Sequence, residues 1–216
     1  MKKVLLSVAL LASATSFAQS NSFKPGFYAG IEAGVAKVKD QANSTAAALV
    51  ADVGGTATVT QDTSVNVGRI FGGYKVTENF DVEVGYFRSS NFETTFSGVS
   101  GGNNSVAYSG SSSTKISSYD YSVIARPSIS TGWNNAFLAV GGHHSEGKNT
   151  TNAITALNSA SNTTKFNGNG YLYAAGYDAN VAKNIDVRFK ITRLEKIGGE
   201  SDNKATLYSV GVLSKF

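Results

Sequence analysis

Apolar and polar residues alternate along most of the chain, which is the pattern of strands whose two faces meet different surroundings. In the segment 27–37, the odd positions from Phe27 to Val35 are apolar, whereas Glu32 lies on the opposite face. Seven further segments continue this pattern: 64–75, 80–92, 115–126, 136–144, 165–177, 185–197 and 204–216. The pattern predicts eight strands. Most are longer than an ordinary globular strand, which has roughly five or six residues. Their length matches the roughly 9–11 residues of a tilted strand that crosses a bilayer.

The connections between these segments alternate in length. The segments 39–63, 93–114 and 145–164 are long and rich in Ser, Thr, Asn, Gly and Ala, and 46–53 could form one or two helical turns. Short turns are expected near 77–79, 127–135 and 178–184, and the last connection, 198–203, is also short. Long loops at one end and tight turns at the other are typical of bacterial outer-membrane barrels.

The first residues have the form of an export signal. Lys2 and Lys3 precede an apolar run at 4–14, and Ser16 and Ala18 are the small residues that a signal peptidase reads. We therefore expect a signal peptide at 1–18 and a single barrel domain at 19–216. No apolar run is long enough for a spanning helix, so any membrane insertion must use strands.

Composition excludes several classes of function. The chain has no Cys, which excludes disulfide frameworks, thiolate zinc sites, Fe–S clusters and lipid attachment at Cys. The formal charge is +4, but without Lys2 and Lys3 the remainder is close to balanced. Because no basic cluster is visible along the remaining sequence, nucleic acid is not expected as a partner.

One hairpin and the C-terminus carry a family resemblance. The stretch 68–86 reads GRIFGGYKVTENFDVEVGY, which resembles the Gly-Tyr strand end, tight turn and Glu-x-Gly-Tyr return of small OmpA-like outer-membrane barrels. Phe216, at the end of an alternating strand, resembles the signal read by the barrel assembly machinery, although Ser214 stands where that signal usually has an apolar residue. The resemblance implies an all-β fold: an eight-stranded, antiparallel, up-and-down transmembrane β-barrel in the outer membrane, with long external loops and short periplasmic turns.

Aromatic residues gather near the predicted strand ends. Amphipathic rings favour the two membrane interfaces, so two girdles are expected. The turn-end set is Phe27, Tyr74, Phe80, Trp133, Tyr177 and Phe216, and the loop-end set is Phe92, Tyr119 and Phe166.

Charged residues fall on the face expected to point into the barrel. An eight-stranded barrel is narrow, so charges placed inside it must pair. We expect an interior charge network of Glu32, Arg69, Glu83, Asp120, Arg188 and Lys190, with Asp186 also facing inward. The network predicts a plugged barrel. The alternative is a pore in which the same charges line a water path.

One short cluster, His143-His144-Ser145-Glu146, suggests chemistry. Lipid A deacylases are also eight-stranded barrels and use a His-x-Ser-Asn pattern, but Glu146 replaces the Asn here. His143 and Ser145 would share one face of a strand, whereas His143 and His144 point to opposite faces and form a poor metal site. We expect no enzymatic activity, no metal and no cofactor.

The sequence thus predicts a structural or surface-interaction role in the outer membrane. Resemblance and loop composition suggest contacts with outer-membrane lipid and lipopolysaccharide, with the barrel assembly machinery, and through the loops with a host or cell-surface ligand. The alternatives are a small-solute pore or hydrophobic-molecule channel, a lipid A-modifying hydrolase, and a soluble exported β-sandwich or lipocalin-like binder.

Overall fold

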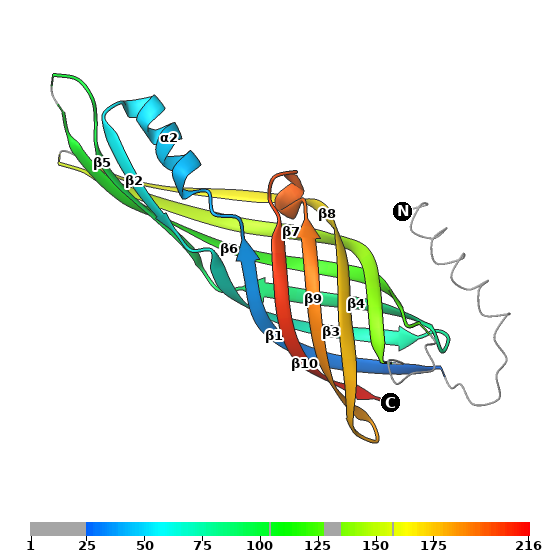
Figure 1. Ribbon diagram of the computed structural model, residues 1–216. Coiled ribbons are helices and arrows are strands. Elements are labelled where there is room, and N and C mark those ends of the chain that lie inside the picture. Colours follow the sequence, from blue (N-terminus) through cyan, green and yellow to red (C-terminus); the bar gives the residue numbers. More distant parts are fainter. Residues whose placement is uncertain (1–24, 104, 128–134, 157) are drawn as a thin grey trace.

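The computed structural model describes residues 25–103, 105–127, 135–156 and 158–216, and eight of its strands close into a ring (Figure 1). Each strand pairs antiparallel with its neighbours, and the first and last strands close the ring. The predicted eight-stranded antiparallel barrel is confirmed. In ring order the strands are β1 (Gly26–Val38), β3 (Ser64–Lys75), β4 (Phe80–Ser89), β6 (Ala107–Ala125), β7 (Ala136–Thr155), β8 (Ser159–Ala182), β9 (Ile185–Glu195) and β10 (Ala205–Lys215). The expected signal peptide, 1–18, lies outside the described residues.

The two faces of the wall differ as the alternation predicts. In β1 and β9, Glu32, Asp186 and Arg188 are buried inside the barrel, whereas Ile31 and Phe189 point outward and are exposed. The exposed apolar side chains form a continuous band around the barrel, here called the apolar belt: Phe27, Ile31, Val35, Ile70, Phe80, Val84, Tyr119, Tyr121, Val123, Leu138, Val140, Tyr171, Tyr173, Ile185, Phe189, Ile191, Tyr208, Val210 and Val212. Such a band fits lipid and is far larger than the apolar patches of soluble proteins. It therefore argues against the soluble β-sandwich or lipocalin-like alternative.

The segments predicted as long loops are instead largely folded. Strands β6, β7 and β8 have 19, 20 and 24 residues and continue beyond the barrel, where β5 (Phe92–Val99) and β2 (Thr56–Gln61) extend the sheet. This part, the sheet extension, also carries the helix α2 (Ala42–Val53), which contacts β2 at the end of the molecule opposite the C-terminus (Figure 1). The extension strands are rich in Ser and Thr and carry only scattered apolar residues, among them Val59, Phe92 and Phe96, so the apolar alternation that reveals strands is weak there. Among the described residues, no helix is long and apolar enough to span a membrane.

A tight connection closes the barrel wall between β9 and β10. Lys196, Gly198 and Gly199 have positive φ angles of 58°, 70° and 88°, which lets the short 3-10 helix η2 (Ile197–Gly199) turn back over the wall. Glycine adopts these angles without steric cost. The turn carries the Ile197 side chain into the barrel, where it is buried.

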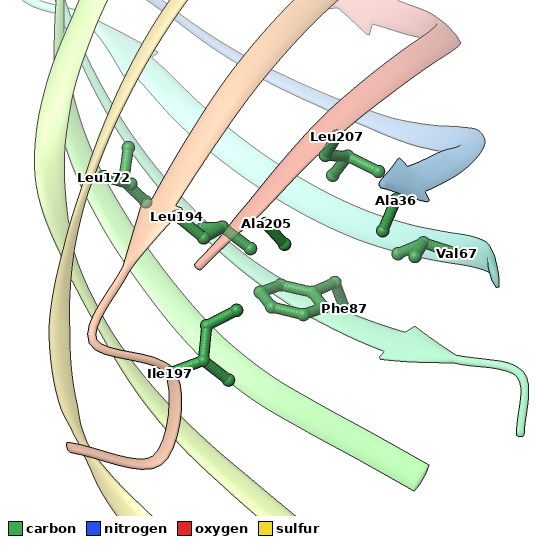
Figure 2. Close-up of a cluster of buried hydrophobic side chains, with 8 residues drawn as sticks. All are labelled: Ala36, Val67, Phe87, Leu172, Leu194, Ile197, Ala205 and Leu207. Carbon is green, nitrogen blue, oxygen red and sulfur yellow. The ribbon is translucent and has the colours of Figure 1, made fainter. Parts of the chain in front are cut away.

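Apolar side chains fill the barrel at the end nearest the sheet extension (Figure 2). This group, here called the apolar layer, consists of Ala36, Val67, Phe87, Leu172, Leu194, Ile197, Ala205 and Leu207. The sequence predicted a polar interior, and the structure adds this apolar group at the loop end, where the buried polar residues Ser118 and Ser145 lie on the strands beside Phe87. The layer was not predicted because each element contributes only one or two of its residues, and only the register brings them together.

Candidate functional site

The strand register brings the predicted interior charges together in the middle of the barrel. Glu32 on β1 is the direct cross-strand partner of Arg69 on β3. Glu83 on β4 is opposite Ser122 on β6, two residues from Asp120 and on the same face of that strand. Arg188 and Lys190 enter from β9 on the other side of the ring. All six residues, Glu32, Arg69, Glu83, Asp120, Arg188 and Lys190, are buried. We call this group, with the residues added below, the charge network.

Arg69 binds three carboxylates. Its Nε and Nη2 atoms both donate to the Asp120 carboxylate, and Nε lies 3.0 Å from Oδ2. Nη2 is also 2.9 Å from Glu83 Oε1, and Nη1 is 3.4 Å from Glu32 Oε1. A planar guanidinium suits this arrangement because its donors form a fixed fork. Gly85 on β4 lies directly opposite Asp120, and a Cβ atom there would collide with the Arg69 guanidinium.

Arg188 is the most deeply placed of the cations, with 0% exposed surface. It donates from Nε to Asp178 Oδ1 at 2.7 Å and from Nη2 to Oδ2 at 3.0 Å, and its Nη1 atom binds Glu83. Lys190 joins the same group through Glu32 Oε1, 3.1 Å from its Nζ atom. Glu32 and Glu83 are therefore each shared between cations from opposite sides of the barrel.

The network extends toward the turn end through residues that sequence reasoning missed. Arg126 donates to Asp81 at 2.9 Å and to Asp178 at 2.8 Å, and the Tyr28 hydroxyl donates to Glu83 Oε2 at 3.2 Å. Asp81 follows one predicted turn and Asp178 is the first residue of another, 178–184, and Asp is common in turns for local reasons. Their inward parity with Glu83 and Arg188 was the available signal.

Two inward aromatic rings lie against these cations. The Phe71 ring centroid is 5.0 Å from the Arg69 guanidinium carbon and 4.9 Å from that of Arg188. Phe137 lies 4.9 Å from Arg188 and 5.3 Å from Arg126. The rings exclude water and interact favourably with the cations through their faces. The arrangement is therefore a core of ion pairs and rings in which every charge has at least one partner of opposite sign.

Two further residues lie at the turn end. Asp186 is buried as expected and pairs with Lys215, apart from the central carboxylates. Phe216 is 80% exposed, and its backbone N–H donates to Phe27 O at 3.0 Å beside the seam that joins the first and last strands. The role of Phe216 as an assembly signal stays a prediction.

The expected aromatic girdles differ at the loop end. Phe27, Phe80 and Phe216 are exposed at the turn end, and Trp133 lies outside the described residues. At the loop end Tyr119 is exposed on the apolar belt, but Phe92 and Phe166 lie on the sheet extension beyond it. Both were expected at the ends of barrel strands, 80–92 and 165–177, because the residues beyond them were predicted as loops. Exposed tyrosines also lie on the outward face within the apolar belt: Tyr121, Tyr171, Tyr173 and Tyr208.

His143 and Ser145 meet inside the barrel wall. His143 Nδ1 is 2.8 Å from Ser145 Oγ, and Nε2 is 3.0 Å from the Glu195 backbone carbonyl. Because that carbonyl can only accept, we assign the proton to Nε2, so that Nδ1 accepts from the Ser145 hydroxyl. A serine nucleophile needs such a base, but Ser145 is 0% exposed and Nε2 faces a carbonyl where an orienting carboxylate is usual. His144 points outward, bonded to Asn169 at 2.8 Å.

Replacing Ser145 with Ala is therefore expected to affect stability and leave membrane lipid unchanged. The change removes the hydrogen-bond partner of a buried imidazole nitrogen, which costs about 1–3 kcal/mol of unfolding free energy. Urea titration of the barrel in phospholipid vesicles would measure this loss, with Ser117→Ala on the outward face as the matched control. An altered lipid A acyl pattern in cells that carry Ser145→Ala would contradict this expectation and favour the hydrolase.

Comparisons with known proteins agree with this architecture. Residues 5–216 match the family model described as the outer membrane protein beta-barrel domain. No curated protein sequence matches the chain. Among solved structures, the attachment invasion locus protein Ail of Yersinia pestis is 15% identical with a TM-score of 0.44, covering 88% of this chain and 98% of Ail.

A second similar structure is OprG from Pseudomonas aeruginosa, which is 13% identical with a TM-score of 0.42 and covers 89% of this chain and 95% of its own. Neisserial surface protein A is 16% identical with a TM-score of 0.39, and the match covers 90% of this chain and 100% of that protein's chain. The family match extends over nearly the whole chain and includes every strand of the ring. The chain therefore belongs to the outer membrane β-barrel family and lies in the outer membrane.

Proposed function

We propose that this protein is a closed, non-enzymatic outer-membrane anchor that holds its sheet extension outside the cell as a surface for interaction. The observation that carries the proposal is the double filling of the barrel. The charge network occupies the middle, and the apolar layer lies between it and the sheet extension. A solute that crossed the barrel would have to separate buried ion pairs and then displace the side chains of the apolar layer.

The sheet extension supplies the interacting part of the proposal. It continues three barrel strands without a hinge, so its position relative to the membrane is set by the barrel. Its polar faces and the edge strand β2 are open to solvent or to a partner. A host or cell-surface ligand would be recognised here, while the barrel serves as the anchor.

The closed barrel predicts no steady ion conductance in planar bilayers. The refolded protein would be tested after its heat-modifiable gel mobility has shown that the barrel is formed. Folded protein without conductance supports the anchor. Steady conductance that changes when Glu83 is replaced by Gln would overturn it in favour of a pore, because Glu83 lies at the centre of the filled region.

A further inference from the structure

Three lysines lie side by side on the outward face, just beyond the apolar belt. In the strand register, Lys115 on β6 is directly opposite Lys148 on β7, and Lys148 is directly opposite Lys165 on β8. All three are exposed. Directly opposed side chains of adjacent antiparallel strands have Cβ atoms about 5 Å apart, and like charges at this distance destabilise the sheet. The sequence shows no basic cluster because these lysines are separated along the chain and only the register brings them together.

The surroundings of the lysines form a shallow groove of about 550 Å³. Arg88 on β4 lies in the same groove, and its cross-strand partner is Ser117. Glu146 also lines it, opposite Ser117, and its carboxylate is 3.8 Å from His144 Nε2. We call Arg88, Lys115, Lys148 and Lys165 the basic patch. With Glu146 included, the groove keeps an excess of positive charge.

The basic patch differs from the other cations near this level of the wall. Arg193 and Lys204 both bind Glu195, at 3.0 Å each, and the hydrogen bond to Glu195 raises the pKa of Lys204. By contrast, no carboxylate among the described residues forms an ion pair with any member of the basic patch. Four neighbouring cations that form no ion pair, beside the single carboxylate of Glu146, are suited to bind a multivalent anion.

An apolar depression lies directly below the basic patch, on the membrane side. It has a volume of about 580 Å³ and lies on the same strands, β4, β6, β7 and β8, together with β3. Tyr86, Tyr119, His144 and Asn169 lie side by side along the rim that faces the basic patch. Gly72 also lines the depression and, having no side chain, leaves space there. From Tyr119 to Lys115 is four residues along β6, or about 13 Å along the strand. Seen from the membrane, the order is therefore apolar depression, polar rim and cations.

We propose that the basic patch and the apolar depression together bind one phosphorylated glycolipid of the outer leaflet, with its phosphates on the lysines and an acyl chain in the depression. The vertical order of the two sites matches the order of chemical groups in such a lipid. A soluble anion would use only the upper site. The lipid relieves the repulsion among the lysines, because its phosphates supply the counterions that the protein lacks.

The test measures binding of bisphosphorylated lipid A to the full-length barrel in detergent micelles, after removal of co-purified lipid. The triple variant Lys115→Gln, Lys148→Gln, Lys165→Gln is expected to bind roughly 100-fold more weakly, since each lysine near a membrane surface contributes several-fold. The control removes equal charge elsewhere: Lys37→Gln, Lys39→Gln, Lys183→Gln. This control is expected to retain most of the affinity.

A single charge reversal separates binding from folding. Lys148→Glu places a carboxylate between Lys115 and Lys165, so it is expected to stabilise the sheet while lowering lipid A affinity about tenfold or more. Retained heat resistance with lost binding supports the proposal. Unchanged binding by both Lys148→Glu and the triple variant overturns it.

A second pair of probes distinguishes a lipid from a free anion. The phosphorylated glucosamine disaccharide without acyl chains is expected to bind at least about tenfold more weakly than lipid A. Gly72→Leu fills the depression and is expected to weaken lipid A binding without affecting the disaccharide, because a Cβ at Gly72 meets only the Tyr28 carbonyl oxygen, at 3.8 Å. Equal affinity for lipid A and the disaccharide would overturn the glycolipid assignment.

Discussion

Replacing Arg188 with Met is expected to lower the free energy of unfolding by about 3–5 kcal/mol, because the change leaves buried carboxylates without their counterion. Arg188 holds Asp178 with two hydrogen bonds and also binds Glu83, and all three side chains are buried. Met fills a similar volume, so the loss reports the charge and its hydrogen bonds. Urea titration in phospholipid vesicles would measure it.

The matched control is Arg88→Met on the outward face, which removes the same side chain from an exposed position without an ion pair among the described residues. A change within about 0.5 kcal/mol is expected there. The double variant Arg188→Met, Glu83→Gln should lose less unfolding free energy than the sum of the two single changes. Each single change leaves the buried charge of the other residue without one of its partners, whereas the double variant removes both charges. An Arg188→Met barrel as stable as Arg88→Met would show that the charge network does not stabilise the fold.

The predicted strands and faces were the part that sequence could supply. Alternation gives the parity of each strand, and parity alone places Glu83 and Arg188 inside and Ile31 and Phe189 outside. It does not give the register between strands, because each neighbour can slide by two residues without exposing its apolar face. The ion pairs among Arg69, Asp120 and Glu83, and the row of lysines outside, both depend on that register.

The sheet extension could not be predicted for a different reason. Alternation is visible only where one face is buried, and the outer parts of β6, β7 and β8 are polar on both sides. Their strand conformation is imposed by the barrel strands from which they continue, since pairing already begun in the wall propagates outward. The same argument applies to Phe166, which was interpreted as a membrane aromatic. It lies instead on the part of β8 that belongs to the sheet extension, and its ring packs near Gly198 of η2.

Phe87 carries the second large expected effect. It is 5% exposed at the centre of the apolar layer, between Val67 and Ile197 in Figure 2, and no other side chain can fill its place without moving a strand. Phe87→Ala is therefore expected to cost about 3–5 kcal/mol, the combined loss of burial and of packing around a cavity. The control, Phe80→Ala on the half-exposed outward face, should cost less because lipid can occupy the vacated space.

Conductance measurements on the same variants test whether the barrel has two barriers in series. Phe87→Ala alone widens the apolar layer but leaves the ion pairs of the charge network below it, so no steady current is expected. Glu83→Ala alone loosens the network beneath an intact apolar layer and should also stay closed. Only the combined variant is expected to conduct. Steady current through Phe87→Ala alone would show that the apolar layer is the whole barrier, and that the charge network contributes stability without closing the barrel.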